Sequence, residues 1–109
     1  WESWITEVVR RSVRAGDHVV EVGANFGYYS VLIADLVGSE GSLLTLEANP
    51  RLAELTAMSL HFNGLSRRAN VLSKAAADQP GWATLATSRR NAGGGALSAD
   101  PRALGEDCE

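Results

Sequence analysis

Short apolar runs alternate with longer amphipathic stretches along this chain, a pattern typical of strands that alternate with helices. The first run, His18–Val22, is rich in β-branched residues and predicts a fully buried strand. A second run at Ser42–Leu46 predicts another buried strand, and a weaker third strand is expected at 69–73. Residues 82–87 alternate enough to predict a short fourth strand after the turn at 78–81.

Helices are predicted before and between these strands. Apolar residues recur at helical spacing over 1–13, and this first helix is expected to pack over the sheet. The next helix, at 28–37, follows a glycine turn. A third is predicted at 50–62, because Asn49 suits the N-cap and Pro50 the first helical position. This order predicts an α/β fold with a Rossmann-like parallel sheet and flanking helices.

The turn at 23–27 joins the first strand to the helix after it. Gly23 and Gly27 can take backbone dihedrals that are closed to other residues, and Asn25 tolerates a positive φ. Such a turn at the carboxyl edge of a parallel sheet is typical of a site for a nucleotide-type ligand. A dinucleotide site would want Gly-x-Gly-x-x-Gly, whereas the spacing here is Gly-x-x-x-Gly. An NAD-binding Rossmann-type oxidoreductase fragment therefore remains an alternative that the spacing disfavours.

Two acidic residues lie on either side of this turn. Glu21 lies just before it, and Glu47 ends the second strand. A carboxylate at the end of the second strand can accept hydrogen bonds from a ribose diol, each worth roughly 1.5–3 kcal/mol. Taken singly, Glu21 also suits the start of a helix and Glu47 a solvated strand end. Taken together, with the glycine turn between them, the two acids favour ligand binding.

These motifs resemble those of class I S-adenosylmethionine-dependent methyltransferases, and specifically of the FkbM family. Residues 20–30, VEVGANFGYYS, resemble the first motif, and residues 46–50, LEANP, resemble the second. Residues 75–81, AAADQPG, resemble the third, and residues 91–94, NAGG, resemble the Asn/Gly segment of that family. The sequence departs from the family pattern by Glu21 in place of Asp and by Ala48 in place of Pro.

The resemblance implies a pose for S-adenosylmethionine as cofactor. Glu21 would lie near its amino group, Glu47 would hold the ribose hydroxyls, and Ala48 would pack beside the adenine. The glycine turn would lie against the methionine part, and the alanine pair of the third motif would line the other side of the adenine. The cofactor-binding residues so implied are Glu21, Gly23, Ala24, Asn25, Gly27, Tyr28, Glu47, Ala48, Asn49, Ala75 and Ala76.

Composition and charge indicate the number of domains, the expected location and the kinds of partner that are not expected. The chain has 109 residues and a net charge of −3, which predicts one domain and gives no electrostatic footprint for nucleic acid. Its one cysteine, Cys108, cannot form an internal disulfide, and a cytoplasmic location is expected. No apolar run approaches the ~20 residues of a membrane span. His18 and His61 have no partner at metal-ligand spacing, so no metal site is predicted.

The function predicted from the resemblance is methylation of a hydroxyl on a small molecule or sugar. Residues 1–87 would form the cofactor-binding half of a methyltransferase domain, and residues 88–109 a loop or tail leading to later strands that are missing. The catalytic residue stays unassigned, because the family's later acidic segment has no counterpart here. A non-catalytic cofactor-binding remnant is the further alternative, and an uncovered sheet edge would allow self-association.

Overall fold

Three parallel strands form the centre of the computed structural model, which describes residues 3–86 and 96–98. They are β1 (His18–Val22), β2 (Ser42–Leu46) and β3 (Ala69–Leu72), in the spatial order β1-β2-β3. Val22 is paired with Leu46, and Leu46 with Leu72, so the carboxyl ends of all three strands meet at one edge of the sheet. The predicted Rossmann-like parallel sheet is thereby confirmed.

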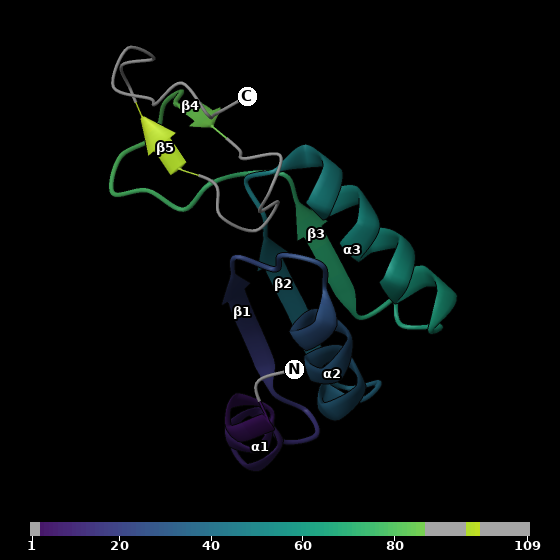
Figure 1. Ribbon diagram of the computed structural model, residues 1–109. Coiled ribbons are helices and arrows are strands. Elements are labelled where there is room, and N and C mark those ends of the chain that lie inside the picture. Colours follow the sequence, from purple (N-terminus) through teal and green to yellow (C-terminus); the bar gives the residue numbers. More distant parts are fainter. Residues whose placement is uncertain (1–2, 87–95, 99–109) are drawn as a thin grey trace.

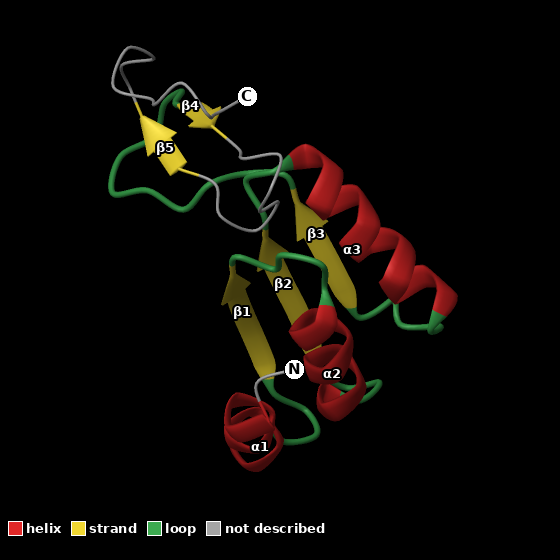
Figure 2. Ribbon diagram, in the orientation of Figure 1, coloured by secondary structure: helices red, strands yellow, loops and turns green. Residues whose placement is uncertain are grey.

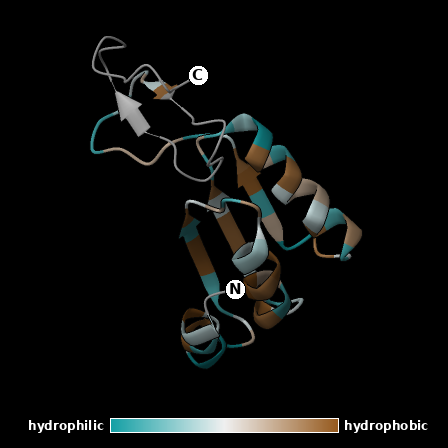
Figure 3. Cartoon of the chain, viewed as in Figure 1, coloured by the Kyte–Doolittle hydropathy of each residue, from teal (hydrophilic) through white to brown (hydrophobic). Residues whose placement is uncertain are grey.

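Two helices cover one face of this sheet, α2 (Tyr28–Val37) and α3 (Pro50–Phe62), as Figures 1 and 2 show. Asn49 caps α3 as predicted, since its side chain accepts a hydrogen bond from the Arg51 amide at 3.0 Å. In Figure 3 the hydrophobic colours gather on the strands and on α2. The buried core between the helices and the sheet consists of Ile33, Ala34, Val37, Leu43, Leu60 and Leu65.

The prediction of a fully buried first strand is wrong for β1. Val20 is 64% exposed and Val22 is 63% exposed, whereas Val19 between the layers packs against the core. The cause is that α2 and α3 both lie on the same face, so the described residues cover one side of β1 only. Burial on both faces of a parallel strand requires helices on both sides of the sheet.

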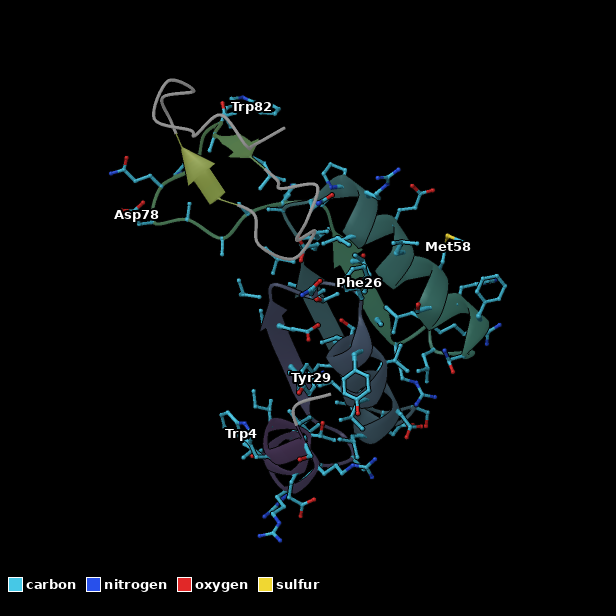
Figure 4. The ribbon with its side chains drawn as sticks, viewed as in Figure 1. Trp4, Phe26, Tyr29, Met58, Asp78 and Trp82 are labelled. Carbon is cyan, nitrogen blue, oxygen red and sulfur yellow. The ribbon has the colours of Figure 1, made fainter. Side chains whose placement is uncertain are left out.

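The first helix also lies elsewhere than predicted. α1 (Ser3–Ser12) is confirmed as a helix, but it lies at the amino end of β1, with α2 as its main neighbour, and does not cover the sheet (Figure 1). Val9 and Val13 reach the core from this position. Trp4 is exposed and points away from the sheet in Figure 4. Helical periodicity correctly indicates a buried stripe, but it does not specify which element the stripe contacts.

A separate hairpin follows the main sheet. β4 (Thr84–Ala86) pairs antiparallel with β5 (Ala96–Ser98), which confirms a short strand within the range 82–87. Trp82 precedes β4 and is 99% exposed. β5 falls within 88–109, which was predicted as loop or tail, and the other residues of that range lie outside the described part of the chain. The boundary of the two predicted segments at residue 87 stays a prediction.

Among the described glycines, Gly41 has the least room for a side chain. A Cβ atom added at this buried glycine would lie 2.5 Å from the carbonyl oxygens of both Asp17 and Val37. Because both neighbours are backbone atoms, they cannot move aside cheaply. We expect Gly41→Ala to lower the free energy of unfolding by roughly 1–3 kcal/mol, measured by urea denaturation of the full-length protein. Ser39→Ala, at an exposed position of the same loop, is the matched control, and equal midpoints for the two variants would contradict the close approach.

Candidate functional site

The glycine turn after β1 has the strained backbone that the sequence predicts. Gly23 has φ 82°, Asn25 has φ 55° and Gly27 has φ 86°. Asn25 is the single non-glycine residue with a positive φ among the described residues. The turn is tied to the end of β2, because the amides of Gly23 and Ala24 both donate to the Leu46 carbonyl, at 2.8 and 3.3 Å. The turn therefore sits at the carboxyl edge of the sheet, where ligands bind in open α/β sheets.

Glu47 links this turn to the loop after β2. The residue is 9% exposed, and its carboxylate accepts two backbone hydrogen bonds, from the Asn25 amide to Oε2 at 2.8 Å and from the Asn49 amide to Oε1 at 3.0 Å. Hydrogen bonds to an ionised acceptor are roughly twice as strong as neutral ones. One side chain thus fixes both loops that the cofactor pose would use. Each carboxylate oxygen keeps further lone-pair capacity for a ribose hydroxyl.

Thr56 of α3 holds the same turn from the other side. Its hydroxyl donates to the Asn25 carbonyl at 3.2 Å, and the residue is fully buried. A Cβ atom on Gly27 would lie 3.0 Å from Thr56 Oγ1 and 3.1 Å from Thr56 Cα. α3 therefore packs directly against the turn, and this packing requires a glycine at position 27.

Glu21 points beneath the turn, toward the helices. Its Oε1 atom accepts hydrogen bonds from Ser30 Oγ at 2.5 Å and from Thr45 Oγ1 at 2.7 Å. Ser30 lies in the first turn of α2 and Thr45 in β2, and both are fully buried. The carboxylate thus ties β1 to β2 and α2. Its predicted contact with the cofactor's amino group stays a prediction.

Ser30, Thr45 and Thr56 were missed by the sequence reasoning, although a signal for them exists. Thr45 and Leu43 are the two buried residues of β2, so their side chains lie on the same face of the strand. Ser30 belongs to the buried face of α2, together with Ala34 and Val37. A polar residue in an apolar stripe needs a hydrogen-bond partner when it is buried. Reading each buried stripe for its polar exceptions would have identified all three.

The remaining predicted site residues differ in their burial and in the elements that they approach. Ala24 is buried in the turn, and Ala48 is half-buried beside Glu47. The Tyr28 hydroxyl lies 3.5 Å from Thr6 Oγ1, so this side chain reaches toward α1. Ala75 and Ala76 are exposed in the loop that leaves the carboxyl end of β3. Hydrogen bonds thus bring the turn, Glu47 and Asn49 together, whereas the Tyr28 hydroxyl lies on the side of α1.

Asn25 carries a buried polar atom that lacks a partner. Its Oδ1 is shielded from solvent and accepts no hydrogen bond within the described residues. A buried acceptor without a donor costs about 1–3 kcal/mol, so such an atom commonly marks a place where a ligand or water completes the site. By contrast, a Cβ added at Gly23 would meet nothing within 4 Å, so the space beside that backbone is open.

A groove lies on the helical side of this site. It has a volume of about 650 Å³ and runs between α2 and α3, with Arg10 of α1 at its wall. Phe26, which Figure 4 shows between the two helices, and Gly27 line the end near the turn. Glu21 and Glu47 do not line it, so the groove is distinct from the acidic side of the site.

Neither a metal-binding cluster nor a membrane-spanning helix is present in the described part of the chain. Within it, no three His, Cys, Asp or Glu side chains gather in an arrangement that could hold a metal ion. None of its helices has the length and apolar character needed to span a bilayer.

Comparisons with known proteins extend these observations. A family model described as protein-L-isoaspartate(D-aspartate) O-methyltransferase (PCMT) matches residues 2–106. The protein-L-isoaspartate O-methyltransferase of Ignicoccus hospitalis is 50% identical over 42 residues, covering 38% of this chain and 20% of that protein. The catechol O-methyltransferase of Mus musculus is 40% identical over 60 residues, covering 55% of this chain and 23% of that protein. A solved SAM-dependent O-methyltransferase from Thermotoga maritima is 26% identical, with a TM-score of 0.58 over 66% of this chain and 26% of that one.

These matches confirm the fold class, but they cover only part of each related protein. The parallel sheet with flanking helices is that of class I S-adenosylmethionine-dependent methyltransferases. The matched segments span about a fifth of the length of the curated relatives. The finer expectation of the FkbM family is not shown by them, so the likeness of its motifs remains a resemblance.

Proposed function

Because the chain belongs to the protein-L-isoaspartate(D-aspartate) O-methyltransferase (PCMT) family, we propose that the whole protein is an S-adenosylmethionine-dependent O-methyltransferase. The observation that carries this proposal is the glycine turn anchored by an acidic side chain. Glu47, at the end of β2, holds the Asn25 amide and the Asn49 amide together at the carboxyl edge of the sheet. That edge is where a nucleoside-containing cofactor is bound in folds of this kind.

The residues present fit S-adenosylmethionine. Glu47 offers a carboxylate to the ribose hydroxyls, and its backbone anchors already fix its direction. Asn25 offers the buried Oδ1 acceptor, which a donor of the cofactor would satisfy. Beside Gly23 the backbone is open on the side where a Cβ would stand, so a ligand can approach it closely. The side chains of Ala48 and of the alanine pair at 75–76 are small enough for an adenine ring to pack flat against them.

The chemistry then depends on placement. When bound, S-adenosylmethionine would supply an activated methyl group, which passes to an acceptor oxygen as the bond from the methyl carbon to the sulfonium sulfur breaks and S-adenosylhomocysteine leaves. The residues of this chain hold the donor half of that arrangement: Glu47 orients the nucleoside, and the turn at 23–27 orients the amino-acid end. Well-oriented reactants gain roughly 7–11 kcal/mol over free ones, so rigid anchoring of both ends contributes directly to rate.

The first candidate acceptor is the free carboxylate of an L-isoaspartyl residue in a peptide or protein. The match to the protein-L-isoaspartate methyltransferase family over residues 2–106 favours it. A carboxylate is already deprotonated at neutral pH, so its methylation requires no general base. The second candidate, a hydroxyl on a small molecule or sugar, is favoured by the similarity to catechol O-methyltransferase and would require a base to take the proton.

Isothermal titration of the full-length protein tests the cofactor. We expect binding of S-adenosylmethionine and of its demethylated product S-adenosylhomocysteine, and no binding of NAD, because the turn lacks the middle glycine of a dinucleotide site. Binding of NAD alone would contradict the proposal and favour the oxidoreductase alternative. Binding of S-adenosylmethionine without transfer to any acceptor would favour the non-catalytic remnant.

The acceptor is identified by the stability of the methylated product. The full-length protein is incubated with methyl-labelled S-adenosylmethionine and either an isoaspartyl peptide, the same peptide with normal aspartate, or a catechol. A methyl ester releases labelled methanol in mild base, whereas a methyl ether does not. We expect base-labile label on the isoaspartyl peptide and none on its aspartyl control. Base-stable label on the catechol alone would favour the hydroxyl acceptor.

A further inference from the structure

Asn25 is held at both of its backbone polar groups by side chains from two different elements. Its amide donates to Glu47 Oε2 at 2.8 Å, and its carbonyl accepts from Thr56 Oγ1 at 3.2 Å. The residue is also left-handed, with φ 55°. A non-glycine residue pays roughly 1–2 kcal/mol for that conformation, so it persists only where the surroundings enforce it.

Thr56 is an unusual residue for its place. A threonine inside a helix commonly turns its hydroxyl back to the carbonyl four residues earlier. Here the hydroxyl instead crosses to the turn, 31 residues earlier in the sequence, while the residue remains fully buried. Thr56 also lies close to Gly27, because a Cβ added at that glycine would lie 3.0 Å from Oγ1, so α3 and the turn are in direct contact at this point.

We propose that Thr56 is a positioning residue for the cofactor-binding turn, an inference that rests on the proposed function. Glu47 fixes the amide side of Asn25 and Thr56 fixes the carbonyl side, so the two peptide planes of this residue are set before any ligand arrives. Those planes set the direction of the Cα–Cβ bond of Asn25, from which the side chain with its unpartnered Oδ1 extends. Preorganisation of this kind raises affinity by removing the cost of ordering the loop on binding.

If Thr56 positions the turn, loss of its hydroxyl should weaken the binding of only one part of the cofactor. The turn is expected to hold the amino-acid part, and Glu47 the ribose. Loss of the Thr56 hydroxyl should therefore weaken S-adenosylmethionine more than 5′-methylthioadenosine, which has the same nucleoside but lacks the amino-acid part. A residue that merely supports the fold would weaken both ligands alike.

The test compares Thr56→Val with Thr56→Ser in the full-length protein. Valine keeps the shape but removes the donor, and we expect the Kd and KM for S-adenosylmethionine to rise about tenfold, with kcat and the acceptor KM changed less than about twofold. The Kd for 5′-methylthioadenosine should change less than about twofold. Serine keeps the hydroxyl and should restore S-adenosylmethionine binding to within about twofold of wild type. Ser59→Ala, one turn further along α3, is the matched control and should bind both ligands as wild type does.

Each outcome separates this inference from the proposed function. If the wild-type protein does not bind S-adenosylmethionine, the proposed function itself fails. If wild type binds and a folded Thr56→Val binds equally well, or loses both ligands to the same extent, the positioning role is overturned. If Thr56→Val does not fold, as judged by circular dichroism, Thr56→Ser decides: retained affinity supports the hydroxyl's role, and lost affinity overturns it.

Discussion

Glu47→Gln is expected to weaken S-adenosylmethionine binding by the full-length protein at least about thirtyfold and to lower its free energy of unfolding by roughly 2–3 kcal/mol. The carboxylate now accepts from the Asn25 amide and from the Asn49 amide. An amide side chain has one acceptor oxygen, so one of these backbone donors would face an NH₂ group. The same change removes the charged acceptor proposed for the ribose. Isothermal titration and urea denaturation measure the two effects.

The control for this change is Glu54→Gln, the same substitution at an exposed position of α3. It should leave both the affinity and the unfolding midpoint unchanged, since surface carboxylates contribute little. If Glu47→Gln kept the affinity of wild type, the proposed ribose role of Glu47 would be wrong, whatever the stability result. If only the affinity fell, the bridge between the two loops would be weaker than its distances indicate.

The second large effect is expected from a pair of glycine variants. Gly27→Ala should lower the free energy of unfolding by roughly 2–5 kcal/mol, whereas Gly23→Ala should lower it by roughly 1–2 kcal/mol. Both glycines have φ above 80°, so both alanines carry the left-handed penalty. Only at Gly27 does the added Cβ meet Thr56, at 3.0 Å from its hydroxyl oxygen, while at Gly23 it meets nothing within 4 Å.

The two variants should also separate stability from binding. The Cβ of Gly23→Ala would occupy space in which the cofactor is proposed to lie, so we expect this variant to lose most S-adenosylmethionine affinity while remaining more stable than Gly27→Ala. Thermal unfolding and titration on the same samples give both quantities. Equal destabilisation by the two alanines would contradict the packing of α3 on the turn, and unchanged affinity in Gly23→Ala would contradict the proposed pose.

Local backbone features were predictable from the sequence because neighbouring residues determine them. The positive φ of Asn25 is favoured by its side chain and by its place between Gly23 and Gly27, and the cap of α3 follows from Asn49 and Pro50. The strand and helix order followed from periodicity. The order of the elements then predicted that Glu47 lies at the carboxyl edge of the sheet.

The partners of the site residues were not predictable in the same way. Thr56 meets Asn25 across 31 positions, and Thr45 meets Glu21 across 24, so neither pairing leaves a local pattern. The exposure of Val20 depends on which faces of the sheet are covered, and periodicity within β1 carries no information about that. Glu21 and Glu47 could be located from the sequence, but the pairing of Glu21 with the Ser30 and Thr45 hydroxyls came only from the packing.

The alternation of β1 has a consequence for insertions and deletions. Glu21 faces Ser30 and Thr45 because it occupies the inward phase of the strand, while Val20 and Val22 occupy the outward phase. Removal of one residue ahead of Glu21 would turn its carboxylate to the open face and turn a valine toward two buried hydroxyls. Substitution of Val20, which is exposed within the described residues, is expected to cost little stability, whereas a change in the number of residues between Asp17 and Gly23 would shift the pairing of β1 with β2. The outward positions of the strand are therefore expected to tolerate a change of side chain, whereas the length of the strand is constrained.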